Sequence, residues 1–227
     1  MQPQIVAGVL LAAGGGSRLG RPKALVVVGG QSMARRGITL LRDGGTNPVV
    51  VVTGATGPDT DVTAPQAGVS VPDAGVTGPD TGPDDREEAV ISVHNPDWAT
   101  GMGSSLAVGL AAVPDECTAA VLALADQPLV GPKAVRRLLA AHAAGASVAV
   151  ACYDGRPRNP VLISREHWPE VIALASGDVG ARPFLRAHQA LVTEVECGDT
   201  GRPDDVDSPE DLARIEALLA GAVPFPS

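Results

Sequence analysis

A glycine-rich segment near the start of the chain carries the residues best suited to phosphate chemistry. Three successive glycines at positions 14–16 leave backbone amides without a neighbouring Cβ, so these amides can turn toward a polyphosphate. Arg18 and Lys23 add two positive charges to the same segment, and Pro22 stiffens the chain directly before the lysine. We therefore predict a loop that binds the triphosphate of an NTP, with Arg18 and Lys23 directed at its β- and γ-phosphates.

Two other glycine-rich phosphate motifs fail at specific positions. A Walker A loop requires Lys-Ser/Thr directly after its second glycine, but Arg21 and Pro22 follow Gly20 in this chain. A dinucleotide-binding fingerprint that starts at Gly14 requires a glycine where this chain has Leu19. The remaining alternative is a glycine-rich surface turn whose basic residues bind nothing.

Asp126 is the acidic residue best placed to hold a metal ion beside this loop. It follows the apolar run 119–125 and precedes Gln127, which puts it at the carboxyl end of a predicted buried strand. Ligands bind at the carboxyl ends of strands in parallel sheets, and carboxylate oxygens are suitable ligands for Mg²⁺. We predict that Asp126 binds Mg²⁺; the alternative is a solvated aspartate in a turn.

Predicted strands and helices alternate along the chain, which favours a mostly parallel sheet between two layers of helices. Continuous apolar runs indicate strands that are buried on both faces, and capping residues and glycines delimit the helices. We expect strands at 5–12, 48–53, 90–93, 119–125, 147–153, 161–163 and 191–195, and helices at 32–41, 104–112, 132–144, 165–175, 179–188 and 209–220. The predicted fold class is α/β, a three-layer sandwich in a single domain that spans residues 1–227.

Residues 54–88 interrupt this alternation. They are rich in Gly and Pro and hold eight acids and one base, so they contribute −7 to the formal net charge of −9. The rest of the chain, with 18 acids and 16 bases, is nearly neutral. Few bulky apolar side chains are present to offset the ordering entropy, and we interpret 54–88 as a flexible acidic insertion. Docking of a basic partner is the alternative.

Composition and patterning exclude several classes of protein. The absence of a basic stripe argues against nucleic acid binding, and the absence of an apolar run of about 18 residues argues against a membrane span. The N-terminal residues lack the basic region of a signal peptide. The three cysteines are widely separated and form no CxxC pair, and the four histidines show no metal-ligand spacing. We therefore expect a protein of the reducing cytoplasm.

Five segments together resemble the MobA-like nucleotidyltransferases, which share the wider NTP-transferase fold. The segments are LAAGGGSRLGRPK at 11–23, NPDWATGMGSSL at 95–106, LADQP at 124–128, GDVGAR at 177–182 and DVDSPEDL at 205–212. Their combination is most similar to the molybdenum cofactor cytidylyltransferase branch, and the resemblance covers nearly the whole chain outside 54–88. It implies a Rossmann-like nucleotidyltransferase fold.

The resemblance also implies where the nucleotide and the metal ion bind. It makes Asp126 a metal ligand and Asp207 a second one, although an acid at position 207 equally suits the start of the following helix. It places the backbone of Leu11, Ala12 and Ala13 against the base edge. The sequence Leu-Ala-Ala-Gly is more like the cytidylyl branch than the guanylyl branch, which favours CTP.

Further positions are implied to contact the nucleoside or the acceptor. Ser105 is implied to contact the base or ribose, while Ser104 is expected to cap the helix that it opens. Asp178 and Arg182 are implied to border the pocket of a pterin acceptor. We interpret Trp98 and Trp168 as packing anchors rather than stacking platforms.

The activity that the resemblance implies is transfer of CMP from CTP to a phosphorylated small molecule, molybdenum-bound molybdopterin, with Mg²⁺ as cofactor and pyrophosphate as product. One alternative is a nucleotidyltransferase with another acceptor, such as a sugar or alcohol phosphate. Another is a non-catalytic nucleotide-binding partner of a molybdenum hydroxylase. A plain oxidoreductase is disfavoured because the dinucleotide fingerprint and a redox cysteine pair are missing.

Overall fold

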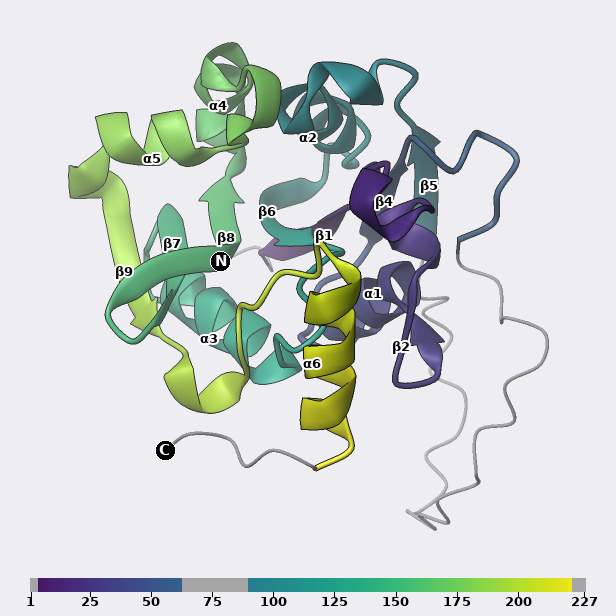
Figure 1. Ribbon diagram of the computed structural model, residues 1–227. Coiled ribbons are helices and arrows are strands. Elements are labelled where there is room, and N and C mark those ends of the chain that lie inside the picture. The colour runs from purple at the N-terminus through teal and green to yellow at the C-terminus, as the bar shows by residue number, and fades with distance from the viewer. Residues whose placement is uncertain (1–3, 63–89, 222–227) are drawn as a thin grey trace, which may run out of the picture.

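The computed structural model describes residues 4–62 and 90–221, which form a seven-stranded sheet flanked by helices (Figure 1). The strand order is β5-β4-β1-β6-β8-β7-β9. The strands are β1 (Ile5–Leu11), β4 (Val49–Thr53), β5 (Val90–His94), β6 (Cys117–Leu124), β7 (Val148–Tyr153), β8 (Arg156–Ser164) and β9 (Val192–Glu196). A separate hairpin joins β2 (Val27–Val28) to β3 (Gln31–Ser32).

Helices cover both faces of the sheet, which confirms the predicted three-layer α/β fold (Figure 1). One face is covered by α1 (Met33–Asp43) and α3 (Pro132–Ala143), and the other by α2 (Met102–Ala111), α4 (Trp168–Leu174) and α5 (Arg182–Ala187). The last helix, α6 (Pro209–Leu219), packs on the β2–β3 hairpin. Short 3-10 helices complete the path: η1 (Ser17–Leu19), η2 (Lys23–Leu25), η3 (Trp98–Thr100), η4 (Arg165–His167), η5 (Gly177–Val179), η6 (Gln189–Leu191) and η7 (Gly198–Thr200). No described helix has both the length and the apolar character needed to cross a membrane.

The central strands are apolar along their whole length because both of their faces are buried. In β1, Val6 and Leu10 pack with α1 and α3, while Ala7 and Val9 pack with α2 and α4. The same alternation divides the four valines of β4 between the two layers. A continuous apolar run is the pattern expected for such strands, and this is why the sequence located them correctly.

Strand direction places several loops at one edge of the sheet. Strands β5, β4, β1 and β6 are mutually parallel, so their carboxyl ends lie together. Strand β8 runs antiparallel to both β6 and β7, and β9 is parallel to β7. A tight hairpin at Asp154 (φ 52°) and Gly155 (φ 68°) joins β7 to β8, so β8 begins earlier than the strand predicted at 161–163.

Residues 54–62, at the start of the predicted insertion, pack on the body of the protein. The Ala55 amide donates to the Ala13 carbonyl (3.1 Å), and Val62 is buried in the core between the sheet and α1. The chain therefore does not leave the fold at residue 54. The remainder of the predicted insertion, 63–88, lies outside the described residues.

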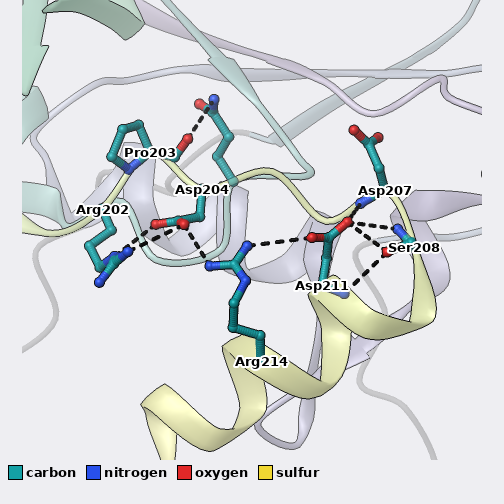
Figure 2. Close-up of polar contacts among 8 residues, drawn as sticks. Arg202, Pro203, Asp204, Asp207, Ser208, Asp211 and Arg214 are labelled. Carbon is teal, nitrogen blue, oxygen red and sulfur yellow. Dashed lines mark hydrogen bonds and ion pairs between the residues drawn. The ribbon is translucent and has the colours of Figure 1, made fainter. Parts of the chain in front are cut away.

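A capping box starts α6, as the acidic sequence around Ser208 predicts (Figure 2). The Ser208 hydroxyl accepts from the Asp211 amide (3.2 Å), and the Asp211 carboxylate accepts from the Ser208 amide (3.0 Å). Arg214 donates to both Asp211 and Asp204 and so joins the helix to the segment before it. These contacts fix the position at which α6 begins.

We expect Ser208→Ala to lower the free energy of unfolding by about 1 kcal/mol, because the amide of Asp211 loses its acceptor. Urea denaturation measures this difference. Ser176→Ala is the matched control: Ser176 occupies the N-cap position of η5, and its side chain makes no capping hydrogen bond. Its substitution is expected to change stability by less than about 0.5 kcal/mol. Equal losses in the two variants would contradict the capping role of Ser208.

Candidate active site

The glycine-rich loop after β1 closes on itself. The Lys23 amide donates to the Gly14 carbonyl (3.1 Å), and the Leu19 amide donates to the Gly16 carbonyl (2.8 Å). Gly16 has a φ of 59°, and a Cβ at this position would lie 2.2 Å from the Arg21 carbonyl oxygen. Glycine is therefore required at position 16, and the backbone itself sets the shape of the loop.

A cavity of about 310 Å³ opens beside this loop, at the carboxyl ends of β1 and β6. Parallel sheets bind their ligands at this edge. The lining residues are Leu11, Ala12, Ala13, Gly14, Gly15, Gly16, Lys23, Trp98, Ala99, Gly101, Met102, Ser105, Leu124, Ala125, Asp126 and Asp178. A second cavity of similar volume, at the amino ends of β6 and β7, is lined by no lysine or arginine and suits a phosphate group less well.

The Lys23 ammonium lies between two carboxylates at the charged end of the cavity. Its Nζ donates to Asp126 Oδ2 (2.8 Å) and also to Asp207 Oδ1. Burial alone would lower the pKa of Lys23, but Asp126 and Asp207 together raise the pKa above its ordinary value. Lys23 is therefore a cation at neutral pH, and it is placed beside the glycine loop as predicted.

The same carboxylates are suited to a divalent cation. Asp126 Oδ1 is buried and has no hydrogen-bond partner among the described residues, so one acceptor remains for a further ligand. Asp207 contacts the same ammonium through Oδ1. The described residues contain no group of three or more His, Cys, Asp and Glu side chains that could hold a metal ion. Two carboxylates supplemented by substrate phosphates and water are a usual environment for Mg²⁺.

Contacts between two loops bring Asp207 to Asp126. The Val206 amide donates to the Asp126 carbonyl (2.9 Å), and Gln127 Nε2 donates to Asp205 Oδ1 (2.9 Å). Figure 2 shows the same segment, in which the Asp204 carboxylate accepts from Arg202 and Arg214. The segment before α6 is thus held by contacts at residues 204, 205 and 206. Asp207 lies directly before the capping residue of α6 and also contacts Lys23.

The cavity includes most, but not all, of the predicted site residues. Leu11, Ala12, Ala13, glycines 14–16, Lys23, Ser105, Asp126 and Asp178 line it. Arg18 and Arg182 are exposed and lie outside the lining, and Asp207 reaches the site through Lys23. Ligand contacts by all of these residues stay predictions.

Asn95, for which the sequence predicted no role, organises the start of α2. Its side chain is 1% exposed and donates from Nδ2 to Ser104 Oγ (2.9 Å) and to Ser105 Oγ (3.0 Å). Its Oδ1 accepts from the Asp97 amide (3.0 Å). Its position directly after an apolar strand was the one feature of the sequence that could have drawn attention to Asn95. Its hydrogen-bond partners are known only from the fold.

Ser104 does not cap α2, contrary to the prediction. The helix begins two residues earlier, at Met102, with Gly101 at the N-cap position. The Ser104 hydroxyl instead donates to the carbonyls of Gly101 (2.9 Å) and Asp97 (3.1 Å). The prediction was wrong because the preceding glycines permit the helix to start before the first serine.

The Asp178 carboxylate accepts from the Met102 amide (3.3 Å) and so stabilises the amino end of α2. Gly101 permits this approach, because a Cβ at that position would lie 2.3 Å from the carbonyl carbon of Gly177. Asp178 therefore supports the wall of the cavity as well as lining it.

The three cysteines are free and buried, and burial raises the pKa of each thiol, that of Cys152 to about 11. Protonated buried thiols are poor nucleophiles and poor redox groups. The chemistry of the site is therefore that of the glycine loop, Lys23 and the two carboxylates.

The sheet, the loop at its carboxyl edge and the lysine–carboxylate cluster define a nucleotide-binding α/β protein of the NTP-transferase type. The chain belongs to the MobA-like NTP transferase domain family, which it matches over residues 8–192. This confirms the family resemblance seen in the sequence.

Individual relatives are similar over nearly the whole chain. Nicotine blue oxidoreductase of Paenarthrobacter nicotinovorans is 35% identical over 217 residues, which cover 92% of this chain and 96% of that protein. Rv0371c of Mycobacterium tuberculosis H37Rv, solved in complex with manganese, is 25% identical with a TM-score of 0.68 and coverage of 94% and 98%. Molybdopterin-guanine dinucleotide biosynthesis protein A of Archaeoglobus fulgidus, at 16% identity, TM-score 0.60 and coverage of 95% and 99%, shares the fold alone.

We expect Asn95→Leu to lower the free energy of unfolding by about 1–3 kcal/mol, because the Asp97 amide and two serine hydroxyls lose a buried partner. Nucleotide affinity should fall with it, since Ser105 is no longer held. Urea denaturation and calorimetric titration measure the two effects. Ser92→Ala, at an exposed position of β5, serves as the control. A variant with unchanged stability and affinity would show that the network does not organise the site.

Proposed function

We propose that this protein is a Mg²⁺-dependent nucleotidyltransferase that moves CMP from CTP to molybdenum-bound molybdopterin and releases pyrophosphate. The observation that supports this most strongly is the cluster of Lys23, Asp126 and Asp207 beside a glycine loop in one cavity. A lysine cation and backbone amides suit a polyphosphate, and the carboxylates suit its metal ion.

The proposed reaction needs no nucleophilic side chain. An acceptor phosphate oxygen forms a bond to the α-phosphorus of CTP, and the bond from that phosphorus to the oxygen bridging the β-phosphorus breaks. The acceptor phosphate is largely ionised at neutral pH, so a general base is not required. Catalysis then comes from alignment and charge stabilisation.

Each residue has a defined role in this proposal. Lys23 and the amides of glycines 14–16 stabilise the leaving pyrophosphate, with Arg18 approaching from the exposed side of the loop. Asp126 and Asp207 would hold Mg²⁺, which when bound offsets phosphate charge. Ser105 contacts the ribose or base.

We propose that different residues select the nucleotide and the acceptor. The backbone of Leu11, Ala12 and Ala13 reads the base, where the Leu-Ala-Ala-Gly sequence favours CTP. Asp178 and Arg182 meet the pterin acceptor. The setting is the reducing cytoplasm, where a molybdenum hydroxylase could receive the product.

A second candidate is an oxidoreductase, which the name of the relative from Paenarthrobacter nicotinovorans favours. Since the cysteines are buried and separate, such an activity requires an external redox cofactor. The pyrophosphate of a reduced nicotinamide dinucleotide is the part that would occupy the glycine loop.

One panel of substrates separates these candidates. The wild-type protein is incubated with each of the four NTPs, Mg²⁺ and molybdenum-bound molybdopterin, and pyrophosphate release is measured. CTP is expected to be the best donor, and EDTA is expected to abolish release. Preference for another NTP would overturn the cytidylyl assignment. No release with any NTP, combined with oxidation of NADH or NADPH in the presence of a quinone-like dye, would favour the oxidoreductase.

We expect Lys23→Ala and Asp126→Ala to lower the rate of pyrophosphate release by about 10²–10³-fold, because each removes a charge at the reacting phosphates. Both should keep the wild-type circular dichroism spectrum, since neither side chain belongs to the apolar core. Lys133→Ala is the matched control: its ammonium pairs with Asp199 on the surface (2.8 Å) and should leave the rate unchanged. Wild-type rates in either site variant would refute the assignment.

A further inference from the structure

Trp98 lines the cavity although the sequence suggested a packing role. Its indole is half-buried and comes from η3, in the connection between β5 and α2. The other tryptophan, Trp168, is 5% exposed, donates from Nε1 to the Ile163 carbonyl (3.0 Å) and packs among the residues of the core. The two tryptophans therefore occupy different environments.

Glycines make the space that the indole occupies. A Cβ on Gly15 would lie 3.0 Å from Trp98 Cζ3, and a Cβ on Gly54 would lie 2.5 Å from Trp98 Cβ. Gly15 follows β1 and Gly54 follows β4, so the indole lies across the carboxyl ends of two neighbouring strands. Any larger residue at either glycine would displace it.

The turn that carries Trp98 is held rigidly. Asn95 accepts from the Asp97 amide, and the Asp97 carbonyl accepts from Thr100 Oγ1 (2.7 Å). The backbone of Asn95 is also held, because its backbone N–H donates to the Thr53 carbonyl (2.8 Å). The indole is thus fixed in place by the same residue that holds Ser105.

Lys23 and Trp98 lie against neighbouring glycines of the loop. The aliphatic part of the Lys23 side chain lies nearest Gly14, with Cδ at 3.7 Å from the position of an added Cβ, whereas Trp98 lies against Gly15. Leu11, Met102 and Trp98 give the same cavity an apolar surface, which suits the nucleoside of a triphosphate that binds Lys23. Among the described residues that line the cavity, Trp98 is the one with an aromatic ring.

We propose that Trp98 is the surface on which the base of the bound NTP stacks. This rests on the proposed function only in that an NTP occupies the cavity. Stacking on an aromatic ring tolerates every base, so Trp98 contributes affinity while the backbone of residues 11–13 supplies selection. Its removal is expected to weaken CTP and GTP binding by a similar factor, about 5–100-fold.

Tryptophan fluorescence tests the proposal directly. The chain has two tryptophans, so Trp98 is the single tryptophan that remains in a Trp168→Phe variant. Titration with CTP or GTP in MgCl₂, without acceptor, is expected to quench its emission to saturation. In Trp98→Leu, the signal of Trp168 is expected to stay constant during the same titration. Saturable CTP binding by calorimetry without quenching of Trp98 would overturn the proposal.

Calorimetric titration of Trp98→Leu and Trp98→Phe supplies a second measurement that does not depend on the Trp168 variant. The leucine variant should lose affinity for both nucleotides, and the phenylalanine variant should recover most of it, because a flat ring remains. Wild-type affinity in Trp98→Leu would overturn the proposal even if nucleotidyl transfer proceeds. Quenching by nucleotides in a protein that releases no pyrophosphate would instead overturn the proposed function and leave the stacking role in place.

Discussion

The pairing of Lys23 with Asp126 and Asp207 is the constraint on which the site depends. The two contacts join residues 103 and 184 positions apart in the chain, so they form only when the glycine loop, β6 and the segment before α6 have all come together. Two carboxylates this close repel each other unless a cation lies between them. The lysine supplies that charge, and Asp126 Oδ1 has no hydrogen-bond partner among the described residues.

The rest of the cavity is arranged around this charged end by backbone shape and buried polar contacts. Gly16 adopts a conformation that a side chain would block, and Asn95 fixes the start of α2 together with the turn that carries Trp98. The conformation of Gly16 and the hydrogen bonds of Asn95 both depend on close packing of the backbone. The cavity is consequently lined both by charged side chains, Lys23 and Asp126, and by apolar ones such as Trp98 and Met102.

The fold alone does not define the reaction. Relatives with this architecture are named for different activities, one as an oxidoreductase and one as a biosynthesis protein of a molybdopterin dinucleotide. One sheet can support different chemistry when the loops at its carboxyl edge change. The reaction therefore has to be argued from Lys23, Asp126 and Asp207.

The sequence by itself determined the three-layer fold, because apolar runs such as 5–12 and 48–53 become strands wherever both faces are covered. It also located the glycine loop with Lys23 at the carboxyl end of β1, because the glycines directly follow an apolar run. Only the tertiary structure decided which side chains lie around the glycine loop. The start of α2 at Met102, the role of Asn95, the place of Trp98 against Gly15 and Gly54, and the approach of Asp207 to Asp126 all depend on contacts between distant segments. Local sequence patterns describe neighbours along the chain, and these contacts are set by how strands and loops pack in space.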